Sequence, residues 1–390
     1  MVKMQKKKNI GILEYHYHTK YLYTMAKIVK TKDTNVTIFT TPDLLSKLKT
    51  YIKNISDYEI VLKKKNESLN SFLKRVEKIC NEKIDLLFVN TIQETILDLP
   101  RFIGFKPKCK MILTIHSVNS WFSMKPELDL KKIFRTVDTN LSKPLIKLFI
   151  LSRFDGINVI YPPIKDHIEK NIDYKKPVYK IPFGFHEKGK DIGKKSDKIL
   201  FVVPGQIEEH RRDYDTVLDA FEKNGKKAGL ILLGYPVGNY GKKILKKCEK
   251  LKEKGFDIKY YDSFVPEEEY NNIMKKSDFL VFPIKIQSLG LGVTKEYYGL
   301  TKGSAAVFEA IQYGKPMIVP DNFNVVEELK NSAVKYTNKE DLGNRISDLI
   351  KDDKKLQKYK INALKDSEKF SIDVLQKYFT EEILNKIDNI

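Results

Sequence analysis

Apolar positions are distributed along the chain in two alternating patterns. Short, nearly continuous apolar runs are separated by longer segments in which apolar residues recur at helical spacing. The first pattern is typical of buried strands and the second of amphipathic helices. The alternation predicts βαβ units and therefore a parallel sheet. In the first half, strands are expected at 9–15, 35–41, 84–90, 109–116, 154–161 and 177–183, with helical segments such as 21–30 and 69–80 between them.

A second series of the same kind begins near residue 198. The segment before it, 187–198, is polar, charged and contains glycine, as linkers often do. We therefore expect an α/β protein with two Rossmann-like domains, residues 1–190 and 191–370, and a C-terminal amphipathic helix at 371–390. Parallel sheets bind ligands beyond the carboxyl ends of their strands, so two facing sheets would form a cleft. The second series predicts strands at 198–205, 228–234, 257–264, 278–284 and 316–321, and helices at 214–223, 241–254, 267–276 and 304–313.

Charge and cysteine content indicate which partners and which cellular compartment to expect for these domains. Lys and Arg number 71 and Asp and Glu 51, a formal net charge of +20. This excess favours acidic partners, namely nucleic acid, sugar nucleotides or an anionic membrane, although a general abundance of lysine explains it equally well. No nucleic-acid-binding module is recognisable, so we expect no such partner. The three cysteines fit no zinc or redox spacing, which favours a cytoplasmic protein.

Membrane-spanning and secretory segments are not expected. The basic N-terminus lacks the apolar run of a signal peptide, and no stretch reaches the roughly 20 apolar residues of a spanning helix. The segment 129–154 mixes Ile, Phe and Leu with Lys and Arg, and Trp121 and Phe122 precede it. It is either a basic amphipathic face for an anionic membrane or a core helix with a solvated basic edge. Membrane contact is therefore expected to be peripheral, on the inner face.

The stretch TKGSAAVFEAIQYGKPMIVP, residues 301–320, combines a small-residue loop with a short helix. Ser304 is a candidate N-cap, Gly314 a C-terminal stop, and Pro316 prevents continuation. A helix start preceded by Gly303 offers free N–H groups to a phosphate, and Glu309 further along could accept hydrogen bonds from a ribose. The alternative is an ordinary capped helix with a solvated acid.

A second motif, VPGQIEEHRRDYDTVLDAF, occupies residues 203–221. Gly205 ends a predicted strand, where glycine allows the chain to turn into the cleft. Arg211 and Arg212 follow, and their guanidinium groups suit a diphosphate. The alternative is a surface cluster of charges that pair with one another.

Two further segments lie at predicted strand ends. His16 and His18 follow the first strand and would face the acceptor side of the cleft. Two histidines without a third ligand are a weak metal site, and no metal or cofactor is expected. Phe264 and Val265 could flank a nucleotide base, or they form an ordinary strand end before a capped helix.

Four segments, taken in order along the chain, resemble the C-terminal half of GT-B glycosyltransferases. They are VPG…HRRDYDTVLDAF, ILLG, YYDSFVPEEEYNNIMKKSDFLVFP and GSAAVFEAIQYGKPMIV. The likeness is closest to the large retaining group called family 4 (group 1). LTIHSVNSW and the FDGINVIYPPIKDHIEKN…YKIPFGFHE pair resemble that group's N-terminal half. The resemblance implies a GT-B fold with its sheets facing across a cleft, and a last helix that packs back on the N-terminal domain.

The resemblance also assigns roles to single residues. It implies that Gly205 and Arg211 contact the donor diphosphate and that Glu309, the second acid of a paired-glutamate motif, holds the donor ribose. The loop whose backbone contacts the diphosphate matches Gly303, Ser304 and Ala305, and His116 matches a histidine near the transferred sugar.

Two positions depart from the family pattern. Thr301 stands where the first acid of the pair is expected, and Gln206 replaces the usual arginine after the first glycine. Glu296 is near enough in sequence to substitute for the missing acid, although its spacing gives no support. Recognition of the donor sugar is therefore expected to differ from that of better-known members.

The expected function is transfer of a sugar from a nucleotide-diphosphate sugar to a glycan, lipid-linked or other cell-envelope acceptor. The resemblance implies a retaining reaction, and without an Asp-x-Asp motif after a strand we expect it to be metal-independent. His116 and Arg211 are the expected catalytic residues, with Arg212 and the helix start at Ser304 also stabilising the departing diphosphate. Two alternatives stay open: a catalytically silent sugar-nucleotide-binding subunit, and a sugar-nucleotide epimerase of GT-B type.

Overall fold

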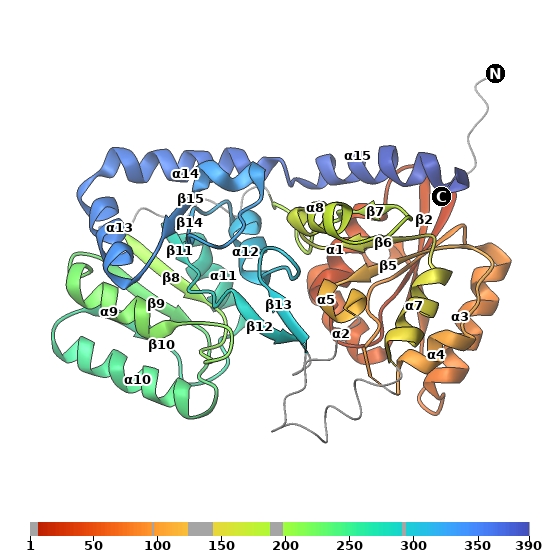
Figure 1. Ribbon diagram of the computed structural model, residues 1–390, viewed down its shortest axis with the longest axis horizontal. Helices are drawn as coiled ribbons and strands as arrows, with labels where there is room; N and C mark the ends of the chain where they lie inside the picture. Colours follow the sequence, from red (N-terminus) through yellow and green to blue (C-terminus); the bar gives the residue numbers. More distant parts are fainter. Residues whose placement is uncertain (1–6, 96, 124–142, 188–197, 291–293, 390) are drawn as a thin grey trace.

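The structure is a computed structural model that describes residues 7–95, 97–123, 143–187, 198–290 and 294–389. It contains two α/β domains that lie side by side (Figure 1). Nearly all of the expected linker and the first part of the expected basic amphipathic segment lie outside the described residues.

The N-terminal domain is built on a parallel sheet. Among the described residues its strand order is β3-β2-β1-β4-β5-β6-β7, the doubly wound order in which the chain reverses beside β1. The strands are β1 (Lys8–Leu13), β2 (Thr34–Thr40), β3 (Glu59–Leu62), β4 (Leu86–Val89), β5 (Lys110–Ile115), β6 (Gly156–Val159) and β7 (Val178–Tyr179). The helices are α1 (Thr19–Val29), α2 (Pro42–Tyr51), α3 (Leu69–Lys83), α4 (Leu99–Gly104), α5 (Val118–Phe122), α7 (Lys143–Arg153) and α8 (Pro162–Asn171).

The C-terminal domain repeats this plan with a parallel sheet of order β10-β9-β8-β11-β14-β15 in its described part. An antiparallel hairpin, β12 (Gln287–Gly290) and β13 (Thr294–Tyr297), leaves the sheet after β11. The sheet strands are β8 (Leu200–Pro204), β9 (Gly229–Leu233), β10 (Asp257–Tyr260), β11 (Phe279–Val281), β14 (Met317–Pro320) and β15 (Ala333–Tyr336). The helices are α9 (Tyr214–Asn224), α10 (Gly238–Glu253), α11 (Glu267–Lys276), α12 (Ala305–Tyr313), α13 (Lys339–Lys351), α14 (Asp353–Glu368) and α15 (Ile372–Glu382).

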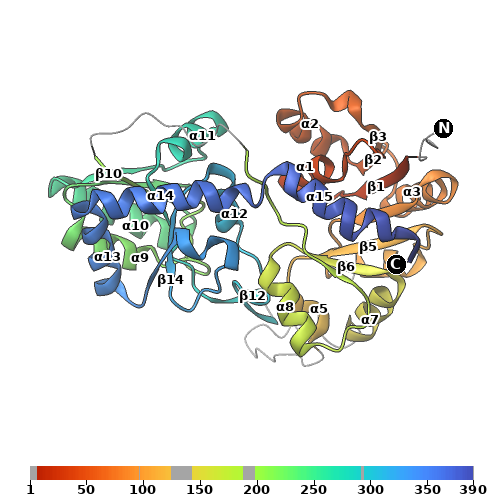
Figure 2. The ribbon, with the colours of Figure 1, turned by 90° about the horizontal axis from the view of Figure 1, so that it is seen from above.

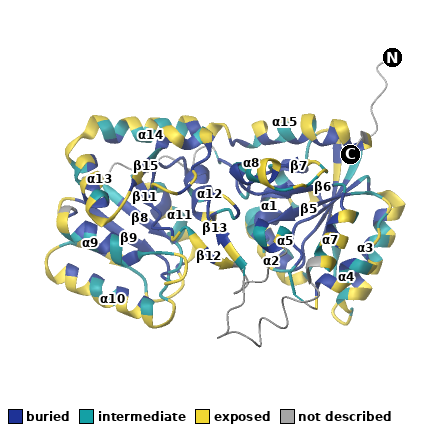
Figure 3. Ribbon diagram, in the orientation of Figure 1, coloured by how far each residue is buried: buried dark blue, intermediate teal, exposed yellow. Residues whose placement is uncertain are grey.

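The buried strands explain why the apolar runs are nearly continuous. Helices cover the sheets, so strand residues are buried while the outer helix faces are exposed (Figure 3). One hydrophobic cluster extends across both domains. In it the Tyr161 ring meets Phe308 edge-on at 6.1 Å, and the Tyr161 hydroxyl donates to the Asn324 carbonyl at 2.7 Å. The two domains therefore share a packed apolar contact beside the cleft.

The last two helices run across both domains, α14 on the C-terminal domain and α15 on the N-terminal one (Figures 1 and 2). Leu375, Phe379 and Ile383 of the C-terminal segment belong to the N-terminal core. The Gln376 amide donates to the carbonyls of Lys27 and Lys30 at the end of α1, at 2.9 and 2.7 Å. The C-terminal helix thus ties the end of the chain to its first helix.

Several expected elements need correction. The strand expected at 177–183 forms only at Val178–Tyr179, and the one expected at 257–264 ends at Tyr260. The strands β3, β12, β13 and β15 and the helices α13 and α14 were not expected. By contrast, α12 begins at Ala305 and ends at Tyr313, and the next residue, Gly314, has a φ of 60°, the left-handed conformation that glycine favours at helix ends.

Candidate functional site

A pocket of about 430 Å³ lies between the two domains. Gly205 and Gly234, which line it, directly follow β8 and β9. The pocket therefore lies at the carboxyl ends of adjacent strands, where parallel sheets bind ligands. Glu309 of α12 lines the same pocket, and Lys20 and Tyr51 reach it from the N-terminal domain.

Gly205 and Gly234 are required because the backbone is in close contact at the ends of β8 and β9. Gly205 has a φ of 101°, a conformation that side-chain-bearing residues rarely adopt. A Cβ on Gly234 would lie 2.0 Å from the Gly205 carbonyl oxygen. The absence of both side chains brings the ends of β8 and β9 together and lets the Arg212 guanidinium pack against Gly205, where a Cβ would lie 2.5 Å from it.

The two arginines after Gly205 lie in different environments. Arg212 is turned back beneath the loop, where its guanidinium donates to the Pro204 carbonyl and to the Tyr214 hydroxyl. Arg211 is exposed, pairs with Glu208 and has its Nη2 3.5 Å from the Gln206 amide oxygen. Gln206 lines the pocket, so Arg211 is close to its rim, whereas Arg212 supports the loop from behind.

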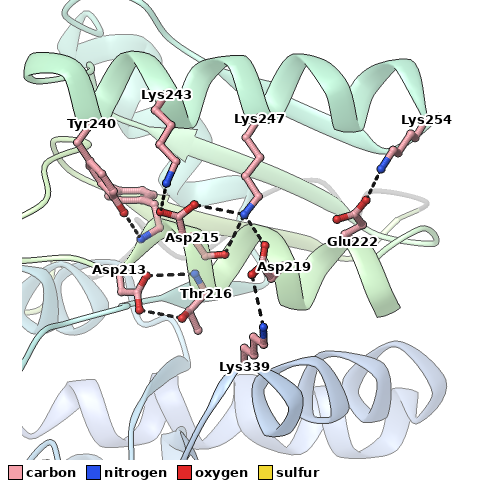
Figure 4. Close-up of polar contacts among 11 residues, drawn as sticks. Asp213, Asp215, Thr216, Asp219, Glu222, Tyr240, Lys243, Lys247, Lys254 and Lys339 are labelled. Carbon is pink, nitrogen blue, oxygen red and sulfur yellow. Dashed lines mark hydrogen bonds and ion pairs between the residues drawn. The ribbon is translucent and has the colours of Figure 1, made fainter.

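Helix α9 fixes the end of this loop. The Asp213 carboxylate accepts the Thr216 backbone N–H at 3.1 Å and its hydroxyl at 2.8 Å (Figure 4). The Tyr214 N–H donates to the Tyr240 hydroxyl of α10 at 3.0 Å. Lys247 of α10 then pairs with acids on α9. The arginine segment is therefore anchored to two helices.

Glu309 is half-buried and has one neighbour that fixes its carboxylate. The Tyr270 hydroxyl hydrogen-bonds it, and burial together with the negative charge of Glu309 raises the pKa of Tyr270 well above its usual value. Tyr270 therefore stays protonated and acts as a donor. Ser304 occupies the N-cap position of α12, but its side chain makes no capping hydrogen bond.

The loop before α12 lies against the N-terminal domain. A Cβ on Gly303 would be 3.0 Å from the Ile160 side chain, and the Thr301 carbonyl accepts the Val118 N–H at 2.9 Å. Ala305 is exposed at the helix start. This loop is thus part of the domain interface, and Gly303, Ser304 and Ala305 are not in the pocket lining.

Glu296 is fully buried at this interface. Its carboxylate accepts the Thr301 hydroxyl at 2.6 Å and the Ser120 backbone N–H at 2.8 Å. A second backbone N–H, that of Asn119, lies 3.4 Å away. Glu296 is therefore held to Thr301, the position that lacks the expected acid, and it links the hairpin to α5 of the other domain.

This carboxyl group makes stability depend on pH. Burial raises the pKa of Glu296 to about 7, from an ordinary value of 4.5. Between these values the folded protein holds a proton that the unfolded chain has released, so the contribution is full below pH 4.5 and is lost as pH rises through 7. Glu296→Gln cannot ionise at this position. The difference in unfolding free energy, Glu296→Gln minus wild type, should therefore increase by about 2 to 3 kcal/mol from pH 5 to pH 8.

Urea unfolding at the two pH values measures this difference. Trp121, the only tryptophan of the chain, lies in α5 beside Ser120 and reports on the interface by fluorescence. Glu327→Gln, at an exposed acid, is the control and should change stability equally at both pH values. A Glu296→Gln difference that is the same at pH 5 and pH 8 would contradict the assignment.

Three histidines expected near the cleft, His16, His18 and His116, make two separate sets of contacts. His18 and His116 stack with ring centroids 4.3 Å apart, and Nε2 of His116 lies 3.0 Å from the Asn90 carbonyl oxygen. Burial lowers the pKa of His18 to about 3 and that of His116 to about 4, so both are neutral at neutral pH. His16 instead lies 2.9 Å from the Asp98 carboxylate. His16 therefore contacts that buried acid, whereas His18 and His116 contact each other.

The structure thus brings together only part of the expected donor set. Gly205, Gln206, Phe264, Val265 and Glu309 all line the pocket, with Phe264 projecting at its rim. The pocket residues that sequence reasoning missed include Lys20, Tyr51, Gly234 and Tyr313, whereas Tyr270 lies in the segment 260–273 that was expected to pass the base. Gly234 alone carried a usable signal, because it ends a predicted strand as Gly205 does. Within the described residues, no three His, Cys, Asp or Glu side chains could together hold a metal ion.

Comparisons with known proteins agree with this architecture. Residues 185–366 match the family model of glycosyl transferases group 1. A glycosyltransferase from Rickettsia africae is similar in structure, with a TM-score of 0.67, 15% identity and 98% of each chain covered. HepE of Anabaena, solved with UDP and glucose, gives a TM-score of 0.66 and 14% identity over 97% of this chain and 100% of that one.

A more distant likeness is to the UDP-GlcNAc 2-epimerase of Neisseria meningitidis. It has a TM-score of 0.54 and 10% identity, with coverage of 97% of this chain and all of that one. No curated protein sequence gives a significant match. Across the described helices, none is long and apolar enough to span a bilayer. The chain therefore has the GT-B fold of two Rossmann-like domains, and its C-terminal domain carries the match to glycosyl transferases group 1.

Proposed function

We propose that the protein is a glycosyltransferase that uses a nucleotide-diphosphate sugar, with UDP as the nucleotide. The observation that carries this proposal is the pocket formed by Gly205, Gly234 and Glu309 at the carboxyl ends of β8 and β9. It lies in the segment that matches glycosyl transferases group 1, and the structurally similar HepE was solved with UDP and glucose.

Each part of the donor has a matching part of the pocket. The Glu309 carboxylate would accept hydrogen bonds from the ribose hydroxyls, held in place by Tyr270. The base would lie against Phe264 and Val265, where an exposed aromatic ring is available. The diphosphate would lie beside the loop at Gly205, which lines the pocket.

For the reaction itself we propose metal-independent transfer with retention of configuration. Negative charge builds on the diphosphate as the bond to the anomeric carbon breaks. Arg211 at the pocket rim and the N–H groups at the start of α12 would stabilise that charge. His116 would contact the transferred sugar as a neutral ring, because burial keeps the pKa of His116 near 4.

For the acceptor we propose a lipid-linked or other envelope glycan reached at an anionic membrane surface on the cytoplasmic side. Helix α7 exposes Leu145, Leu148 and Phe149, which recur at helical spacing on one face. The Arg153 guanidinium lies 4.8 Å from the Phe149 ring centroid, so a cation borders the apolar face. Such a face suits an anionic lipid surface.

The paired change Leu148→Glu with Phe149→Glu tests this contact. It replaces two exposed apolar side chains by acids, so binding to vesicles that contain anionic lipid should fall by about 10- to 100-fold. Vesicle co-sedimentation measures it. Ile361→Glu, at an exposed apolar residue of α14, is the control and should bind normally. Equal binding by the paired variant would show that α7 is not the contact.

Product analysis tests the proposed function. The protein is incubated with UDP-glucose, UDP-galactose or UDP-GlcNAc and a bacterial lipid and glycan extract, with and without excess EDTA. We expect UDP release with incorporation of the sugar into the extract, unaffected by EDTA, and retention seen by NMR. A new sugar nucleotide without acceptor would indicate an epimerase, and donor binding without any product a silent subunit.

A further inference from the structure

Lys20 occupies an unusual position in the donor pocket. It lies in the first turn of α1, in the N-terminal domain, yet it lines a pocket built mostly by the C-terminal domain. Of the lysines and arginines that the structure describes, it is the only one in the pocket lining. Its ammonium group makes no hydrogen bond or ion pair with any described residue. A half-buried cation from the N-terminal domain thus lines the pocket without a partner among the described residues.

The other cations near this pocket are already engaged. The Arg212 guanidinium binds the Pro204 carbonyl and the Tyr214 hydroxyl behind the loop, and its positive charge also interacts with the carboxylate of Glu309. Arg211 pairs with Glu208 at the rim. Position 206, where related enzymes are expected to carry an arginine, holds an uncharged glutamine. The C-terminal domain therefore leaves no free side-chain cation in the described lining.

The acids of the pocket make a cation necessary for an anionic ligand. Glu309 and Glu267 both line it, and a nucleoside diphosphate adds two or more negative charges. Like charges within a few ångströms repel, and the repulsion is stronger in a partly enclosed pocket than in water. A diphosphate would therefore bind more tightly if a positive side chain in the lining itself added to the charge of Arg211 at the rim.

We propose that Lys20 binds the donor diphosphate from the N-terminal domain and supplies the charge that position 206 lacks. The proposal rests on the proposed function, because it assumes that the pocket takes a nucleoside diphosphate. An ammonium group is a compact point charge with three donors, so it can meet phosphate oxygens from a flexible stem. Since Lys20 and Gly205 belong to different domains, donor binding would also hold the two domains together.

Calorimetric titration with UDP tests Lys20. Lys20→Ala should weaken UDP binding by about 10- to 100-fold, the effect of losing a charge-assisted hydrogen bond. It should also flatten the dependence of affinity on ionic strength, because one cation is lost. Lys20→Arg keeps the charge and should retain most of the affinity. Lys27→Ala, on the same helix but outside the pocket lining, should bind UDP as wild type does.

The outcomes separate this inference from the proposed function. If wild type binds UDP and Lys20→Ala binds it equally well, the role of Lys20 is wrong and the donor pocket stands. If Lys20→Ala and Lys20→Arg lose affinity alike with an unchanged salt dependence, the residue acts by packing and the charge role is wrong. If wild type binds none of UDP, GDP and ADP, both proposals are overturned.

Discussion

Glu309→Ala is expected to weaken UDP binding by about 100-fold or more. The carboxylate is proposed to accept two hydrogen bonds from the ribose hydroxyls, and hydrogen bonds to a charged group contribute about 1.5–3 kcal/mol each. The substitution also removes the partner of the buried Tyr270 hydroxyl, which would be left unsatisfied beside the ligand. Calorimetric titration measures the affinity, and a thermal melt without ligand checks that the variant is folded.

The matched variants for this prediction are Glu309→Gln and Glu327→Ala. The glutamine keeps one acceptor oxygen and should show an intermediate loss. Glu327 is an exposed acid of the same domain, outside the pocket lining, and its replacement should leave UDP binding unchanged. If a folded Glu309→Ala protein bound UDP with wild-type affinity, the ribose would not bind at Glu309.

Gly234→Ala is expected to have the largest effect on the fold near the site. The added Cβ would lie 2.0 Å from the Gly205 carbonyl oxygen and 2.4 Å from its carbonyl carbon, both backbone atoms that cannot rotate away. The ends of β8 and β9 would have to separate, at a cost of about 3 kcal/mol as in other overpacked sites. We expect a lower melting temperature and loss of UDP binding together.

Gly104→Ala provides the control for this substitution. Gly104 ends α4, and a Cβ there would have no neighbour within 4 Å, so the same chemical change should leave both stability and UDP affinity near wild type. Differential scanning calorimetry and titration with UDP measure the two properties. A Gly234→Ala protein with normal melting and normal affinity would mean that the two strand ends are not in contact.

Local sequence signals were sufficient to predict the helices and strands that are buried along their length. Helix α12 ends where Gly314 follows a run of apolar residues, and the parallel strands were visible as apolar runs because helices cover both faces of each sheet. The hairpin was not visible because its polarity is reversed: Ser288 and Glu296 are buried, whereas the apolar Leu289 and Tyr297 are exposed. Strand β3 is at most partly buried, and its apolar run, Ile60–Leu62, is only three residues long.

The site was predictable where it depends on the C-terminal domain alone. Gly205 and Glu309 stand out by their positions after a strand and within a short apolar helix. Lys20 and Tyr51 could not be found in this way, because they reach the pocket only through the arrangement of the two domains. The position of the Arg212 side chain was also not predictable, because the sequence does not show that its guanidinium binds the Pro204 carbonyl.

Direct titration of the unmodified chain with UDP tests the central claim, that the pocket between the domains is a donor-nucleotide site. Calorimetry should show saturable binding of one UDP per chain, and UDP should raise the melting temperature in proportion to its affinity. GDP, ADP and CDP, titrated in parallel, should bind more weakly. An absence of saturable binding by all four diphosphates would contradict the account.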